Sequence, residues 1–131
     1  KIETKSNSVD LVTETDQKCE ELVLELLRSK YPAHAIIGEE SCGTHGTYEL
    51  TDAPTWTVDP IDGTTNFVHR LGLSCVLIAF LRNKEVQVGV IYNPTSEELF
   101  WAVRGSGAFL QTRDATVRKL RVSAITDITQ A

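Results

Sequence analysis

The chain has 131 residues, with 13 Lys and Arg against 18 Asp and Glu, which gives a formal net charge of −5. Apolar residues make up 41% and charged residues 24% of the sequence, which excludes an intrinsically disordered chain and supports one folded domain over residues 1–131. The acidic balance argues against a nucleic-acid binder that works by neutralising phosphates, so a chain of this charge that handles phosphate needs metal ions to bring positive charge.

Membrane and disulfide classes are excluded by two simple features. The longest uninterrupted apolar run, residues 75–81, is far shorter than the roughly 20 residues of a transmembrane helix. Cys19, Cys42 and Cys75 show no CxxC spacing, which argues against a disulfide framework and a zinc site. We therefore expect a reduced, cytoplasmic protein without a membrane or nucleic-acid partner.

The first half of the chain predicts one long helix and two short strands. Apolar residues recur at helical spacing within residues 13–30, and Tyr31-Pro32 ends the pattern. Residues 35–37 and 55–59 are apolar enough for strands, whereas residues 41–54 are polar and contain glycines. We expect the latter segment to form a loop or a loose hairpin.

The second half predicts a series of strands joined by short turns. A parallel pair needs a long crossover, so short turns imply antiparallel neighbours. The sequence therefore predicts an α+β fold, with an antiparallel sheet packed against helices. The extended segments are residues 74–82, 86–92, 98–103 and 108–111, with another near 117–122.

Residues 56–67, WTVDPIDGTTNF, place two aspartates around a proline at the expected end of a strand. Pro60 fixes its own φ angle, so the carboxylates of Asp59 and Asp62 and the carbonyl of Ile61 can point at one spot. Hard cations such as Mg²⁺ prefer oxygen ligands of this kind. Two acids at this spacing are on their own more often turn formers or helix caps, so both interpretations stay open at this point.

The Gly-Thr-Thr-Asn sequence at residues 63–66 favours a functional interpretation. Gly63 lets the backbone approach a ligand closely. If Thr64 begins a helix through Phe67 and His69, its free N–H groups and the helix dipole form an anion site. Metal ligands directly before a phosphate site indicate metal-assisted phosphoryl chemistry. The alternative is an ordinary Asp-Gly turn followed by a threonine cap.

Three further acids are candidates of lesser weight. Glu39 and Glu40 follow the strand at residues 35–37, and one of them can complete a carboxylate cluster, although a glutamate pair in a loop is more often solvated. Asp16 lies near the start of the long helix, where an acid interacts favourably with the dipole.

Three segments resemble, in order and spacing, the signature segments of the inositol monophosphatase family. They are VDLVTETD at 9–16, IGEES at 37–41 and WTVDPIDGTTNFVH at 56–69. The resemblance runs from about Lys5 to Ser123 and includes GVIY at 89–92 and GSGAF at 105–109. It implies a Mg²⁺-dependent, lithium-sensitive phosphatase of inositol monophosphates, and the N-terminal half of an αβαβα sandwich.

The resemblance also implies a set of metal ligands. Carried over position by position, Glu39, Asp59 and the carbonyl oxygen of Ile61 would hold a first Mg²⁺. Asp59 would bridge to a second Mg²⁺ that it shares with Asp62. More than one Mg²⁺ ion is thus expected in the complete enzyme.

Catalytic and substrate-binding roles follow from the same resemblance. Thr64, hydrogen-bonded to Asp16, would act with Glu39 to orient and deprotonate the attacking water. Lys5 matches a position in a loop near the family's site. The residues expected to bind the substrate phosphate monoester are Asp62, Gly63, Thr64 and Thr65.

The chain departs from the family pattern in one large respect. Family members are much longer, and a Trp-Asp segment in their second half completes the second metal site. We therefore expect this chain to be an N-terminal piece that exposes apolar surface, and the resemblance further implies a homodimer. Two alternatives stay open: a non-catalytic fragment or isoform that acts through dimerisation, and a bisphosphate nucleotidase or other sugar phosphatase of the superfamily. Residues 65–67, Thr-Asn-Phe, favour the inositol monophosphatase branch.

Overall fold

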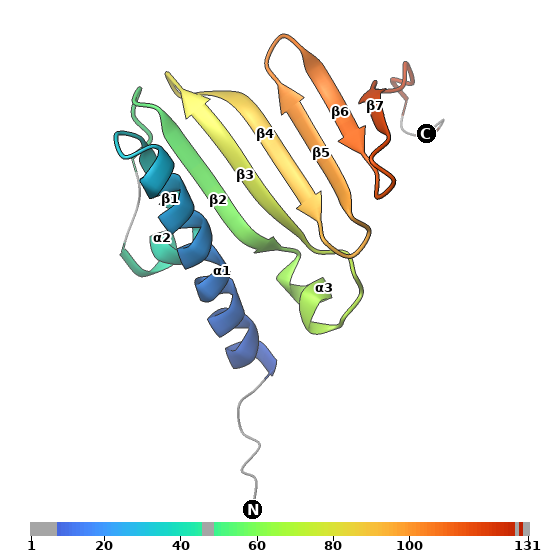
Figure 1. Cartoon of the computed structure of the whole chain (residues 1–131). Coiled ribbons are helices and arrows are strands. Elements are labelled where there is room, and N and C mark those ends of the chain that lie inside the picture. The colour runs from blue at the N-terminus through green and yellow to red at the C-terminus, as the bar shows by residue number, and fades with distance from the viewer. Residues whose placement is uncertain (1–7, 46–48, 128, 130–131) are drawn as a thin grey trace, which may run out of the picture.

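The computed structural model shown in Figure 1 describes residues 8–45, 49–127 and 129. Its elements in chain order are α1 (Ser8–Lys30), β1 (Ala35–Gly38), α2 (Glu39–His45), β2 (Thr55–Asp62), α3 (Thr64–Val68), β3 (Cys75–Arg82), β4 (Glu85–Asn93), β5 (Glu98–Val103), β6 (Gly107–Gln111) and β7 (Val117–Leu120). Lys5 lies outside the described residues. Within the described ranges, no helix is both long and apolar enough to cross a membrane.

The strands form one seven-stranded sheet in the order β1 to β7. Helix α1 lies across the β1–β2 end of this sheet, and α3 lies beside the far end of β2 (Figure 1). The predicted α+β fold is confirmed, and the sheet, predicted to be antiparallel, also contains one parallel pair. β1 and β2 pair in parallel, with α2 in the connection between them, and the remaining neighbours are antiparallel.

Two helix predictions are also corrected. Helix α1 begins at Ser8 rather than at residue 13. The segment 41–54, expected to be a loop or hairpin, contains most of α2, which begins directly where β1 ends. Glycines and polar residues give this short helix no recognisable pattern. The side chain that caps it, Glu20, belongs to α1.

Helix α1 buries an unusual face. Positions four residues apart lie on the same side of a helix, and the buried set is Asp16, Glu20 and Leu24, which are 4%, 3% and 6% exposed. The apolar residues Leu22 and Leu26 are instead 63% and 61% exposed. Two acids therefore occupy the buried face of α1 in place of the apolar stripe that periodicity predicts.

Strand β2 does not end at residue 59 but continues to Asp62. Asp59 pairs with Leu77 of β3 and Asp62 pairs with Cys75, so β2 has one extra residue in this interval. This is a β-bulge, where a buried proline such as Pro60 is tolerated without its N–H group. The bulge bends the strand at the position of the two aspartates.

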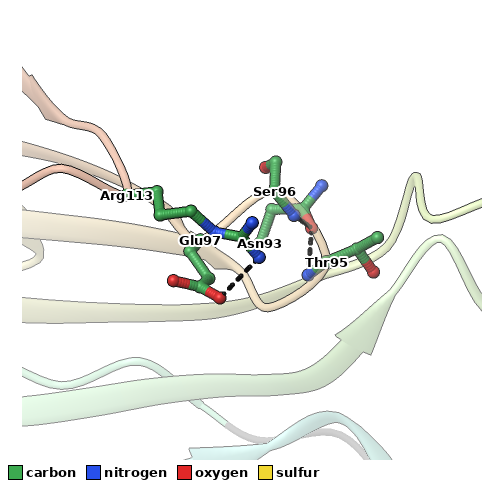
Figure 2. A network of polar contacts seen from close by, with 5 residues as sticks. All are labelled: Asn93, Thr95, Ser96, Glu97 and Arg113. Carbon is green, nitrogen blue, oxygen red and sulfur yellow. Dashed lines mark hydrogen bonds and ion pairs between the residues drawn. The ribbon is translucent and has the colours of Figure 1, made fainter.

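The turn between β4 and β5 is held by side chains, as Figure 2 shows. Asn93 accepts the backbone N–H of Thr95 at 2.8 Å and that of Ser96 at 3.2 Å. Arg113, in the β6–β7 turn, forms an ion pair with Glu97 at 2.7 Å. Two neighbouring turns at this end of the sheet are thus connected.

The outer strands carry the exposed apolar surface that the sequence predicts. A shallow groove of about 250 Å³ lies over β3 to β7. Ile91 and Val103 on these strands are 39% and 36% exposed. The groove is lined by Leu77, Gly89, Val90, Ile91, Phe100, Trp101, Ala102, Ala108, Phe109 and Leu120.

Candidate metal and phosphate site

The β2 bulge brings Asp59 close to acids from two directions. Burial raises the pKa of Asp59 to about 6, and the charge of Glu39, a hydrogen bond with Glu39 and the charge of Asp62 act in the same direction. Glu39 begins α2, whereas Asp62 ends β2. Of the two glutamates left open by the sequence, Glu39 is the one that lies beside Asp59.

Asp16 joins the same cluster from α1. Burial raises its pKa to about 6, and the negative charges of Glu40, Asp59 and Glu20 add to this effect. A carboxyl group surrounded by other carboxyl groups binds its proton more tightly because ionisation adds a like charge to a poorly solvated place. The cluster therefore has a strong demand for positive charge.

Protein cations do not meet this demand within the described residues. The ion pairs there are Lys18–Glu14, Arg104–Glu85 and Arg113–Glu97, all of them on exposed parts of the surface. One oxygen of Asp59, Oδ1, is buried and has no hydrogen-bond partner. A buried carboxylate oxygen without a partner is costly, and an ordered water or a cation can satisfy it.

The donor set fits a hard divalent cation in kind. Carboxylates and a backbone carbonyl are the ligands that Mg²⁺ takes, usually together with waters. Within the described ranges, no three His, Cys, Asp or Glu side chains are close enough together to enclose an ion. Mutual repulsion of the carboxylates favours such spreading.

The backbone after Asp62 turns sharply into α3. Gly63 has φ 83°, in the left-handed region, and precedes the helix without a side-chain cap. A Cβ atom at Gly63 would lie 2.8 Å from the carbonyl oxygen of Leu73, so the position excludes larger residues. The predicted helix does begin at Thr64, but it ends at Val68, before His69. The alternative of a threonine cap is wrong, because Gly63 occupies the cap position.

Thr64 and Thr65 open α3 with exposed side chains next to the acids. The first N–H groups of a helix have no acceptor within it, so they are available to an anion. The hydroxyl of Thr64 donates to the carbonyl oxygen of Ile61 at 3.1 Å. The bond from Thr64 to Asp16 that the family resemblance implies stays a prediction.

Two residues that sequence analysis missed contact the cluster. The thiol of Cys75 donates to Oδ2 of Asp62 at 3.7 Å, and burial together with the Asp62 charge raises the Cys75 pKa. Glu20 accepts two backbone N–H groups at the start of α2. Its spacing of four residues from Asp16 was the available signal, since both then share the buried face of α1.

The fold and this cluster define an α+β protein with a candidate divalent-cation site at the junction of α1, α2 and β2. The chain belongs to the inositol monophosphatase family, whose profile matches residues 1–131. It is 46% identical over 127 residues to inositol monophosphatase 1 of Homo sapiens, an alignment that covers 97% of this chain and 44% of the human protein.

Solved structures agree with this assignment. Inositol monophosphatase-II from Staphylococcus aureus MSSA476 matches with a TM-score of 0.79 and 29% identity, over 92% of this chain and 43% of that one. A structure of SaIMPase-II with inositol monophosphate bound matches with a TM-score of 0.65 and 31% identity, over 76% of this chain and 37% of that one. The chain spans less than half the length of the curated relatives it matches.

Proposed function

We propose that this chain supplies the metal- and phosphate-binding half of a Mg²⁺-dependent phosphatase that hydrolyses inositol monophosphates. The observation that carries the proposal is the buried, unpartnered Oδ1 of Asp59 beside the Glu39 carboxylate. Family membership and the relative with bound inositol monophosphate support the choice of substrate class.

The residues that would hold Mg²⁺ are Glu39, Asp59, Asp62 and the carbonyl of Ile61. When bound, the cation supplies a water of lowered pKa and neutralises charge on the phosphoryl group. Asp59 would be the central ligand, because the charges of both Glu39 and Asp62 raise its pKa and it therefore lies between them. The Ile61 carbonyl oxygen accepts the Thr64 hydroxyl. It would complete the ligand set either by giving up this hydrogen bond or by binding the cation with its second lone pair.

The remaining residues would position the reactants and move a proton. Backbone N–H groups of Gly63, Thr64 and Thr65 would hold the phosphate in line for attack by water. Glu39 would accept a proton from that water, assisted by Thr64 and Asp16. Positioning and electrostatics suffice for such a transfer without a covalent intermediate.

Phosphate release from inositol 1-phosphate by this chain tests the proposal directly. Release in millimolar Mg²⁺ that lithium suppresses would show that the site works without the family's second half, and Glu39→Gln and Asp59→Asn are each expected to lower that release by at least about 100-fold. Asp52→Asn, at an exposed aspartate before β2, is the matched control and should retain release. Equal release by Asp59→Asn would overturn the assignment of Asp59.

The groove over β3 to β7 supports one alternative function. A folded chain that binds Mg²⁺ but releases no phosphate would show that turnover requires the second half of the longer family members. A non-catalytic piece that acts through association is then the alternative, and the groove is a surface for it. Light scattering of the purified chain then measures whether it forms the homodimer that the family resemblance implies. Faster release from a nucleotide or sugar bisphosphate would instead favour the other branches of the superfamily.

A further inference from the structure

Glu20 is a fully buried acid whose two oxygens are both used by the backbone of another helix. It is 3% exposed and projects from α1 toward the start of α2. Its Oε2 accepts the N–H of Glu40 at 2.8 Å, and its Oε1 accepts the N–H of Ser41 at 2.9 Å. These are the second and third residues of α2, whose N–H groups have no acceptor within the helix.

Glu20, a residue of α1, thus caps the N-terminus of α2. A helix is normally capped by a side chain directly before it, but Gly38 and Glu39 leave that role open. The bonds are charge-assisted, which makes them stronger than bonds between neutral groups. The Ser41 hydroxyl adds a weaker bond of 3.4 Å to the carbonyl of Gly38 and closes the first turn.

The junction between β1 and α2 is shaped around this carboxylate. A Cβ atom at Gly38 would collide with the carboxyl group of Glu20. The φ angle of Gly38 is not in the left-handed region, so close approach, rather than backbone conformation, is what requires glycine there. The chain therefore keeps the last residue of β1 small so that Glu20 can reach the helix.

We propose that Glu20 is a positioning residue for the candidate cation site: by binding the start of α2 it holds Glu39 beside Asp59. The proposal rests on the proposed function, since it takes Glu39 and Asp59 as cation ligands. Glu39 lies between Gly38, fixed by its pairing in β1, and Glu40, fixed by Glu20. Its backbone is thus held on both sides, which limits the positions that its carboxylate can take.

Mn²⁺ binding to the 131-residue chain, measured by calorimetry, tests this role without requiring turnover. Loss of a residue that orients a metal ligand typically costs about 10- to 100-fold in affinity, and we expect a loss of this size for Glu20→Ala. Glu20→Asp keeps the charge but shortens the reach, so it should also weaken binding. Glu21→Gln removes a charge from the exposed side of the same helix and is expected to change affinity less than about twofold.

Two comparisons separate failure of this inference from failure of the proposed function. If Asp59→Asn binds Mn²⁺ as tightly as the unsubstituted chain, the proposed cation site itself is wrong. If Asp59→Asn abolishes binding while folded Glu20→Ala and Glu20→Asp bind normally, Glu20 only anchors α2 and the positioning role is overturned. Normal binding by Glu20→Asp alone would show that the charge of Glu20, and not its reach, matters.

Hydrogen exchange gives a readout that needs no variant to fold. In the unsubstituted chain we expect slow exchange of the Glu40 and Ser41 amides, slowed further by Mn²⁺, because the cation and Glu20 restrain the same helical turn. Exchange of both amides as fast as that of exposed turn amides, with and without Mn²⁺, would contradict the inference.

Discussion

Asn93 donates from Nδ2 to the carbonyl oxygen of Gly72 at 3.0 Å. Its Oδ1 accepts the N–H groups of Thr95 and Ser96, which Figure 2 shows beside it. One amide therefore connects the β4–β5 turn to the segment that follows α3. From the other side, Asn66 donates to the carbonyl of Leu73 at 2.9 Å. The segment after α3 is thus fixed by two asparagines.

Replacing Asn93 should loosen this connection. Asn93→Ala removes three hydrogen bonds in a half-buried place, and we expect a loss of about 2 kcal/mol in the free energy of unfolding. Ser96→Ala is the matched control, because it removes only an exposed bond from its hydroxyl to Glu98. Urea unfolding of both variants gives the comparison, and equal effects would contradict a special role of Asn93.

Gly63 is expected to be the least replaceable glycine of the site. Gly63→Ala forces an alanine into a left-handed conformation and places its Cβ against the carbonyl of Leu73. Gly105 has a similar φ of 77° but open space around it, so Gly105→Ala reports the conformational cost alone, about 1 to 2 kcal/mol. In urea unfolding, we expect Gly63→Ala to lower the free energy of unfolding by more than Gly105→Ala does. Similar losses for the two variants would show that the chain relieves the collision with Leu73.

The metal-free chain should become more stable on mild acidification. The pKa of Asp16 is about 6 in the folded chain against 3.8 for the ordinary group, so the folded state binds the proton more tightly. The contribution is therefore fully present below about pH 4 and is lost as pH rises through about 6. Asp59 acts in the same direction.

Urea unfolding at several pH values in a chelator measures this slope. Asp16→Asn should flatten it, since the amide does not titrate, whereas Asp52→Asn at an exposed site should leave it unchanged. Stability that rises with pH between 4 and 6 in the metal-free chain, or a slope unaffected by Asp16→Asn, would argue against the buried acidic cluster.

The parts of the fold that sequence analysis predicted well are those fixed by local patterns. The strand β4 alternates along its length, and a short turn joins it to β5, so the positions of both strands follow from neighbouring residues. Helix α2 was missed because its cap comes from Glu20, far away in the sequence. The parallel pairing of β1 with β2 was missed for the same reason, since α2 forms part of that crossover.

The candidate site shows the same division. Asp59, Asp62 and Gly63 lie in one short segment, so the sequence brings them together, and the structure adds the bulge that bends the strand there. The burial of Asp16 and Glu20 depends on which face of α1 meets β2, and apolar periodicity favoured a different face. The roles of these residues in metal binding and catalysis remain predictions that the experiments above address.

Asp59 should lower the stability of the metal-free chain at neutral pH. Its buried carboxylate repels those of Glu39 and Asp62, and its Oδ1 has no partner. Asp59→Asn removes the repulsion and offers Glu39 an amide donor. A pKa raised by about two units corresponds to about 3 kcal/mol at most, and we expect a gain of about 1 kcal/mol after solvent screening.

The same substitution should abolish stabilisation by Mg²⁺, because a cation that binds only the folded state raises its stability. Urea unfolding at pH 7, in chelator and in millimolar Mg²⁺, measures both effects on one variant. Asp52→Asn should respond to Mg²⁺ like the unsubstituted chain. An Asp59→Asn chain that is less stable without metal, or that is still stabilised by Mg²⁺, would show that Asp59 serves the fold rather than a cation. If Asp59→Asn is more stable without metal and is not stabilised by Mg²⁺, Asp59 lowers stability in the metal-free chain in order to bind a cation.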